Sequence, residues 1–372
     1  MSYAISIRYC KKGTPPFGYM YKIQLSFFDT TPGLKNHLRQ YPLSAIQHRR
    51  NMKTTFYTLL SCFISFSIIS CDARERLDAG AISSFNHLLT SLKHAKDSKD
   101  SIGIIQVQYL DKIKNNCQPF IKEKGLTARK IYESMSLFPK FYNQLANYKT
   151  DFKSINDTIN YIDKKIGHFF DGYKEIKVVL LVGDLSVGGT VDENIIYICL
   201  EMIADNGITD KSELPPYLKS LSEKGTLFAY LAHESVHTIQ AGFPLNELTG
   251  RIIHGKNSLL YTCLLEGSAE YISYYLFGTY LNKSSEAYFM SNRKRIWTKF
   301  TENVEKTPYE YNQWIYSFRP NDGRPADLGY YLGFKICEAF MNLQSDKKKG
   351  LNCLINRNKF KYVYKKSLYN VE

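Results

Sequence analysis

A helical stretch at residues 226–241, which no Gly or Pro interrupts, is the feature that most constrains this chain of 372 residues. Its apolar residues recur every three or four positions, as on the buried face of an α-helix. It also holds His233, Glu234 and His237 in the pattern HExxH. Residues four apart share a helix face, so the two His can bind one Zn²⁺. Glu234 then lies beside the metal and can take a proton from a zinc-bound water, whose pKa is about 7.

A second apolar helix, predicted at residues 258–277, offers the third protein ligand that a catalytic zinc site needs. It carries Glu266 and Glu270, which are four residues apart and share a face. Carboxylates on an apolar helix are costly to bury unless they are paired or bound to a metal. This favours a metal site over the alternative that both face solvent. His254 is a substitute ligand by residue type, but its place in a long connection predicts that it is exposed.

The pattern HExxH at residues 233–237, followed by EGSAEY at residues 266–271, resembles the gluzincin class of zinc metallopeptidases. The resemblance implies that a Glu on the second helix completes the site, and the EGxA form favours Glu266. Glu270 stands where this class often has an Asp that orients a ligand His, which implies a supporting role with a longer side chain. The connection between the two helices is longer than in the aminopeptidase branch of the class.

More narrowly, residues 176–340 are similar to uncharacterised bacterial lipoproteins called predicted Zn-dependent proteases, related to gliding-motility lipoproteins. The resemblance implies a zincin-like, mostly helical α+β fold with a small β-sheet before the active-site helix. Two β-branched apolar runs, at residues 177–182 and 194–200, are the predicted strands. Between them, Gly188-Gly189-Thr190 is either a plain turn or part of the rim of the site. In zincins an edge strand at this place can bind an extended peptide.

A net charge of +14 suggests a nucleic-acid partner, but the distribution of the charge argues against one. Residues 1–70 hold nine Lys and Arg and one Asp, a net +8, which leaves +6 for the rest of the chain. Lys and aromatic residues within 140–149 are more typical of amphipathic helices than of a nucleic-acid surface. We therefore expect no nucleic acid.

A bacterial lipoprotein signal is predicted at residues 52–70, where an apolar core follows Met52 and ends before Cys71. The core is too short to span a bilayer. An aliphatic residue three positions before Cys71 and a small residue one position before it resemble a lipobox. The resemblance implies that Cys71 carries a lipid that anchors the chain to a membrane of the bacterial cell envelope, facing the periplasm or the surface. Residues 1–51 are then a start-site artefact or a disordered extension; the alternative is a buried strand with an incidental Cys.

Three further parts are predicted after the signal: a lipidated tether (71–80), a helical N-terminal half (81–175) and a zincin-like catalytic part (176–372). The expected helices cover residues 102–121, 128–148, 152–169, 286–305 and 326–344, with breaks near Gly125 and Pro139. The Cys residues beyond Cys71 form no CxxC pair, so a cysteine zinc site is not expected.

Candidates to stabilise the oxyanion of the attacked carbonyl are Arg324, one of Tyr330 and Tyr331, and Tyr271 on the ligand helix. Their alternative role is helix packing. The chain is thus predicted to be a membrane-anchored peptidase with one Zn²⁺ on His233, His237 and Glu266, acting on a peptide or protein substrate. The alternatives are an inactive zincin-fold lipoprotein that binds or scaffolds, and a zinc hydrolase of a non-peptide amide.

Overall fold

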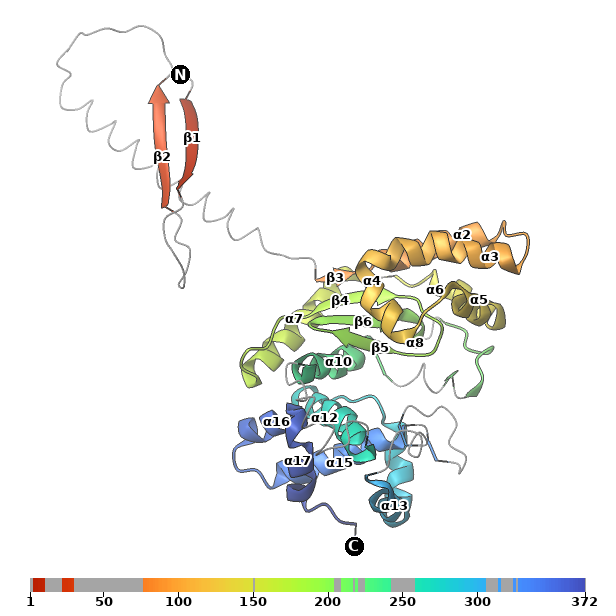
Figure 1. The fold of residues 1–372 in the computed structure, drawn as a ribbon, viewed down its shortest axis with the longest axis vertical. Coiled ribbons are helices and arrows are strands. Elements are labelled where there is room, and N and C mark those ends of the chain that lie inside the picture. Colours follow the sequence, from red (N-terminus) through yellow and green to blue (C-terminus); the bar gives the residue numbers. More distant parts are fainter. Residues whose placement is uncertain are drawn as a thin grey trace, which may run out of the picture. The chain divides into compact units, whose positions relative to one another are not determined.

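The chain forms two compact units, Met1–Ala73 and Arg74–Glu372, which are described separately (Figure 1). The computed structural model describes residues 3–10, 22–29, 76–149, 151–203, 209–216, 218–219, 225–241, 258–305, 314–315, 324–325 and 327–371. The predicted signal at 52–70, Cys71 and His254 lie outside these residues.

The first unit contains two antiparallel strands, β1 (Tyr3–Cys10) and β2 (Lys22–Asp29). Both sequences place an apolar residue at every second position over most of their length, which is the period of a β-strand. These two segments lie in the stretch that was predicted to be a start-site artefact or a disordered extension, which stays a prediction. Translation from Met52 stays a prediction.

A four-stranded sheet organises the second unit, with the order β3-β4-β6-β5. Its strands are β3 (Leu77–Asp78), β4 (Lys177–Leu181), β5 (Gly189–Asp192) and β6 (Ile195–Cys199). The first three in this order are parallel, and β5 runs antiparallel to β6 at the edge. The near-continuous apolar runs of β4 and β6 suit parallel strands that are covered on both faces. Strands β4 and β6 confirm the two strands predicted at residues 177–182 and 194–200.

Strand β5 replaces the turn that Gly188 and Gly189 alone would suggest. It was missed because it is four residues long, begins with Gly189 and ends with Asp192, so it shows no alternating apolar pattern. Strand β3 corrects the predicted tether at 71–80. Leu77 is buried and pairs with Val178, so the last residues of that stretch belong to the sheet.

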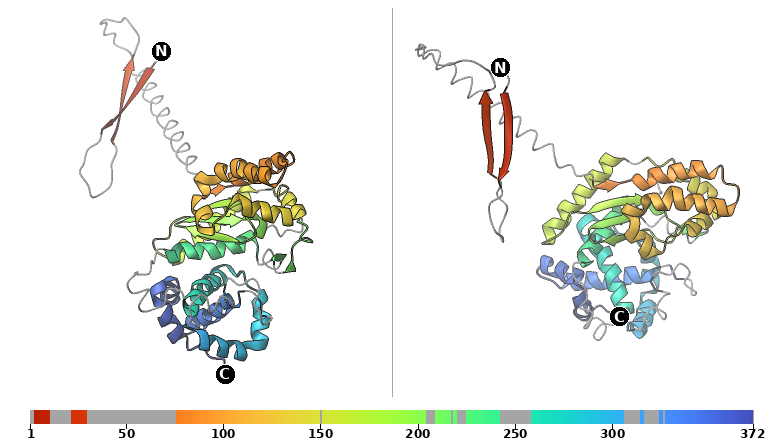
Figure 2. Two further views of the ribbon diagram at one scale, coloured as in Figure 1. Left: turned by 45° about the vertical axis from the view of Figure 1, so that its right-hand side comes forward. Right: turned by 45° about the horizontal axis from the view of Figure 1, so that its top comes forward.

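Helices from the N-terminal half cover one face of the sheet, and α10 covers the other (Figures 1 and 2). The first group comprises α2 (Gly80–Leu92), α3 (Ser98–Ile105), α4 (Asp111–Lys124), α5 (Ala128–Leu137) and α6 (Pro139–Leu145). Helix α7 (Phe152–Phe169), also from this half, packs instead against α10. The predicted breaks at Gly125, in left-handed backbone, and at Pro139 are confirmed. A π-helical segment, Gln106–Leu110, interrupts the helix expected over 102–121.

The C-terminal helices pack below α10, as Figure 1 shows. They are α12 (Leu259–Phe277), α13 (Ser284–Asn303), α15 (Leu328–Asn342), α16 (Lys347–Ile355) and α17 (Phe360–Ser367), while the short α8 (Leu200–Ile203) follows β6. Helix α10 (Leu227–Ala241) and α12 begin one residue after their predicted starts. The fold is α+β and mostly helical. Among the described helices, none has both the length and the apolar character needed to cross a membrane.

Helices α12 and α15 cross at two glycines, Gly267 and Gly333. A Cβ on Gly333 would overlap the carbonyl oxygen of Cys263, and a Cβ on Gly267 would overlap the backbone of Gly333. The two backbones therefore touch next to Glu266. This approach also brings Tyr330, one turn before Gly333, toward α10.

Candidate metal centre

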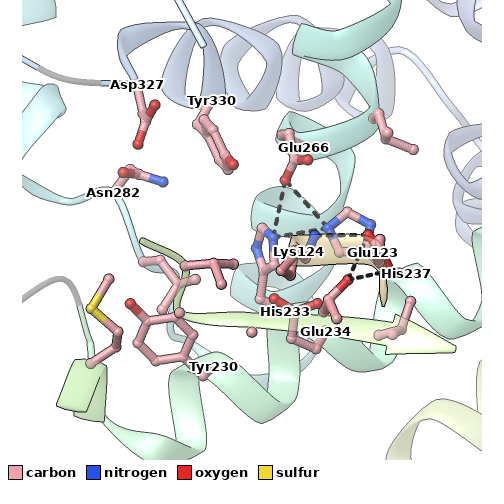
Figure 3. A pocket seen from close by; sticks show the side chains of 18 of the residues that line it. Glu123, Lys124, Tyr230, His233, Glu234, His237, Glu266, Asn282, Asp327 and Tyr330 are labelled. Atoms are coloured by element: carbon pink, nitrogen blue, oxygen red, sulfur yellow. Dashed lines mark hydrogen bonds and ion pairs between the residues drawn. The ribbon is translucent and has the colours of Figure 1, made fainter. Parts of the chain in front are cut away.

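Helices α10 and α12 bring together the three predicted metal ligands, His233, His237 and Glu266 (Figure 3). The two His Nε2 atoms lie 3.0 Å apart, and each lies 3.3 Å from Glu266 Oε2. Ligands at 2.0–2.1 Å from a tetrahedral zinc ion are separated from one another by about 3.3 Å. The three atoms therefore have the spacing of ligands that share one zinc ion.

The burial of His233, His237 and Glu266 favours the binding of a cation between them. Burial by itself raises the pKa of a carboxyl group, yet His237 and His233 hold the pKa of Glu266 well below its usual range. Burial lowers the pKa of His237, but Glu266 outweighs it and raises that pKa to about 9. A buried carboxylate requires a positive partner. A proton on His237 or a bound metal ion can supply that charge.

Gln240 orients His237 from the side opposite Glu266. The Nδ1–H group of His237 donates to Gln240 Oε1 at 2.6 Å, so the ring is oriented with Nε2 facing Glu266, where this nitrogen can hold a proton or bind a metal ion. The Gln240 amide donates in turn to the carbonyl of Leu265 (3.0 Å) and the hydroxyl of Ser268 (2.8 Å) on α12. The sequence analysis missed this residue, although its place three positions after His237 on a helix put it on the same face.

Glu270 lies beside the other ligand histidine, apart from the three converging atoms. Its Oε1 is 3.9 Å from His233 Nδ1, which is too long for a hydrogen bond. The carboxylate instead accepts from the Leu281 backbone and from the Asn282 amide, both at 2.7 Å. Glu270 thus links α12 to the turn after it and faces His233. That it orients the ligand stays a prediction.

Glu234 faces a cavity of about 570 Å³ that also contains the metal-binding group. Burial raises the pKa of Glu234, and the nearby His237 and His233 partly oppose this shift. The other residues that line the cavity include Glu123, Lys124, Gly188, Gly189, Met202, Tyr230, Leu281, Asn282, Asp327, Tyr330 and Arg357. The cavity therefore holds a buried carboxylate next to three candidate metal ligands.

Strand β5 forms one wall of this cavity, and no strand among the described residues pairs with its outer edge, which is called the free edge below. The Cys199 N–H donates to the Gly188 carbonyl at 2.9 Å. Because bonding alternates along antiparallel strands, Gly189 and Val191 direct their N–H and C=O groups to the free edge. A Cβ on Gly188 would meet the Tyr230 ring at 2.6 Å, so a glycine there lets the rim approach α10. These backbone groups can pair with an extended peptide.

Of the predicted oxyanion residues, only Tyr330 lines the cavity, with its ring 6.2 Å from the His233 ring. Tyr271 follows Glu266 by five residues and so points from another helix face, against Phe334. Tyr331 also stacks on Phe334, and Arg324 lies over the Trp314 ring, 4.4 Å from its centre. The structure thus corrects these three assignments, because each side chain packs on an aromatic ring outside the cavity.

Two charged residues of the cavity come from α4, in the N-terminal half. Lys124 Nζ lies 2.7 Å from Glu123 Oε1, and the Thr190 hydroxyl donates to the same carboxylate at 3.2 Å. The sequence around Glu123 and Lys124 is typical of a solvent-exposed helix end, so it gave no reason to predict these two residues in the site.

A family model described as Predicted Zn-dependent protease matches residues 190–353. No curated protein matches the chain. No solved structure matches it either.

Proposed function

We propose, on the premise that residues 190–353 belong to the family of predicted Zn-dependent proteases, that this chain is a gluzincin-like zinc metallopeptidase. In this proposal His233, His237 and Glu266 hold one Zn²⁺, and Glu234 is the general base. The observation that supports it most is the triangle of ligand atoms, 3.0 to 3.3 Å on each side, in the same cavity as Glu234. An intact base beside the metal has no use in a scaffold.

When bound, the zinc ion lowers the pKa of a water molecule and polarises the carbonyl that is attacked. The chain's own residues position the peptide and move the protons. The free edge of β5 binds the substrate backbone through Gly189 and Val191. Glu234 takes a proton from the attacking water and delivers it to the leaving amine. Tyr330 donates a hydrogen bond to the developing oxyanion.

The test compares Glu234→Gln with His233→Ala. We expect Glu234→Gln to keep about one zinc ion per chain and to lose peptide hydrolysis, because an amide cannot accept the proton from water. His233→Ala should lose both zinc and hydrolysis. Elemental analysis and a peptide library, with and without chelator, give the two readouts.

Undiminished cleavage by Glu234→Gln would refute the general-base assignment. Zinc binding without any cleavage by the unmodified chain would indicate a binding or scaffolding protein. Cleavage of small amides but not of peptides would indicate a different zinc hydrolase.

We further propose that the chain is anchored at Cys71 to a membrane of the bacterial cell envelope. The support is the sequence pattern that precedes Cys71. Mass spectrometry of the native protein tests this, and an unmodified Cys71 or a peptide from residues 1–50 would refute it.

A further inference from the structure

The net positive charge of the second unit is concentrated at its C-terminal end. Residues 343–372 contain eight Lys and Arg and two acids, a net charge of +6. Residues 71–372 as a whole also carry +6, since residues 1–70 account for +8 of the total +14. Residues 71–342 are therefore neutral in sum. The whole excess lies on α16, on α17 and on the segments that flank them.

Helix α17 carries part of this charge on its solvent-exposed face. Its buried side chains are Phe360, Val363 and Ser367. The opposite face, a stripe of about 140° around the helix, presents Lys361, Tyr362, Lys365 and Lys366. Among the described residues, Lys365 and Lys366 have no ion-pair partner. Lys361 lies 3.7 Å from Glu305, but the two side chains are 41% and 63% exposed, so this pair contributes little.

Leu368 ends α17 with an exposed apolar side chain on strained backbone. It is 76% exposed and adopts the left-handed conformation, with φ 50° and ψ 22°. Glycine or asparagine is the usual residue in this conformation at a helix end, because a larger side chain is disfavoured there. A leucine therefore costs stability at this position and gains little packing within the chain. Tyr362 is also 49% exposed, so two apolar side chains lie beside the lysines.

We call Lys361, Tyr362, Lys365, Lys366 and Leu368 the α17 surface. A membrane with anionic lipids matches both of its properties. Lysines near such a membrane gain from its negative surface potential, while leucine and tyrosine side chains enter the boundary between headgroups and acyl chains. A nucleic acid supplies phosphates but no apolar layer into which a leucine could insert. The combination of lysines with an exposed leucine therefore favours lipid.

The fold places α16 and α17 near the point where the chain enters the second unit. Arg76, one residue before β3, lies 3.3 Å from Glu175, and Lys348 in the first turn of α16 lies 3.1 Å from Asp171. Asp171 and Glu175 are four residues apart in the segment that follows α7. Helix α17 in turn packs on α16. A lipid on Cys71, five residues before Arg76, would therefore be attached close to this part of the fold.

We propose that the α17 surface docks on a membrane that contains anionic lipids. The cavity approaches the same part of the fold, because Arg357, three residues before α17, lines it. Docking through α17 thus brings the candidate metal centre close to the bilayer. The inference goes beyond the proposed peptidase activity, and its test requires neither zinc nor hydrolysis.

The test measures binding of the full chain to vesicles of phosphatidylcholine alone and of equal parts phosphatidylcholine and phosphatidylglycerol. All proteins carry Cys71→Ser, which prevents attachment of a lipid to this residue. We expect Lys365→Gln/Lys366→Gln to weaken binding to the anionic vesicles about 25-fold, because each lysine near such a surface contributes about fivefold. Binding to the neutral vesicles should be weak in every protein.

Lys99→Gln/Lys130→Gln is the matched control. It removes the same charge from exposed positions on α3 and α5, which lie far from α17 in Figure 1. Both double variants retain residues 1–70 with their charge of +8. The control should weaken binding by less than about twofold, because salt screens distant charges. Thermal unfolding shows whether each variant is folded.

Leu368→Gly tests the apolar contribution separately. It should weaken binding to the anionic vesicles by about tenfold, because no leucine side chain then enters the bilayer boundary. Its melting temperature should equal or exceed that of the Cys71→Ser reference, since glycine suits left-handed backbone. Leu137→Ala, which shortens another exposed leucine on α5, should bind vesicles as the reference does.

Equal losses in the two double variants would overturn the inference, because binding would then depend on net charge alone. Binding of the reference protein that does not distinguish anionic from neutral vesicles would overturn it as well. A DNA duplex and a poly-Glu peptide are tested in parallel. If Lys365→Gln/Lys366→Gln weakened binding to either of these but not to vesicles, the α17 surface would bind that class of partner instead of lipid.

Discussion

Gln240 shows how one buried amide connects the metal centre to the rest of the fold. It accepts from His237 on α10 and donates to two oxygens of α12, so a single side chain fixes a ligand ring and the spacing of the two ligand helices. These roles use different ends of the amide, which allows them to be separated by substitution.

We expect Gln240→Ala to weaken zinc binding by about 10- to 100-fold, the usual effect of losing a partner that orients a ligand. Gln240→Glu keeps an acceptor for His237 but cannot donate to Leu265 and Ser268. It should retain most of the zinc affinity and lower the melting temperature. Competition with a chelator and thermal unfolding measure the two effects. Equal zinc affinity in Gln240→Ala and wild type would contradict an orienting role.

Glu201 is a second buried residue whose chemistry has a measurable consequence. Its Oε1 accepts from the backbone N–H groups of Gly183 (2.9 Å) and Leu185 (3.4 Å), in the loop that leads to Gly188 at the cavity. Burial raises the pKa of Glu201 from 4.5 to about 7. Between pH 4.5 and about 7, Glu201 therefore keeps its proton in the folded state and loses it in the unfolded state.

Because the folded state binds more protons than the unfolded state, stability should fall as pH rises from about 4.5 to 7. The effect of this one group amounts to about 3 kcal/mol at most. Glu201→Gln should accept the same backbone hydrogen bonds without titrating. Its free energy of unfolding should match that of wild type near pH 4 and exceed it at pH 8. A difference between the two proteins that stays constant with pH would refute this prediction.

At the scale of elements, the crossing of α12 and α15 positions Glu266 and Tyr330 together. Gly333 has no room for a side chain, because a Cβ would meet the rigid backbone of Cys263. The helices therefore have to separate when the residue is enlarged.

We expect Gly333→Ala to destabilise the fold by about 1–3 kcal/mol, as overpacking commonly does, and to lower kcat/KM by moving Tyr330 and Glu266. Gly103→Ala on α3 is the control. A Cβ there meets nothing within 4 Å, so this substitution should be neutral or slightly stabilising. Denaturant unfolding and peptide hydrolysis report on both variants. Unchanged stability in Gly333→Ala would show that the helices can separate at no cost.

The two ligand helices could be predicted within a residue, because each carries a strong apolar period and a chemical motif. Strand β5 could not, because its place depends on pairing with β6 rather than on its own sequence. Glu123 and Lys124 were beyond prediction for a similar reason. Only the packing of α4 brings them to a cavity whose other residues come more than sixty positions later.

At the scale of the whole molecule, the cavity is not contained in the segment that the family model matches. Glu123 and Lys124 precede residues 190–353, as do Gly188 and Gly189 at the rim. The sheet crosses the same boundary, since β6 pairs with β4 and β4 pairs with β3. The described part of Arg74–Glu372 therefore works as one unit, in which the N-terminal half completes the candidate site.

The position of β3 limits the length of the linker between a lipid on Cys71 and the sheet. Under the proposal that Cys71 carries the lipid, residues 72–76 are all that separate it from Leu77 in the sheet. When fully extended, the chain from Cys71 to Leu77 spans about 20 Å. Strand β3 would then lie within about 20 Å of the lipid surface. The proposed peptidase would therefore act on proteins close to the membrane that anchors it.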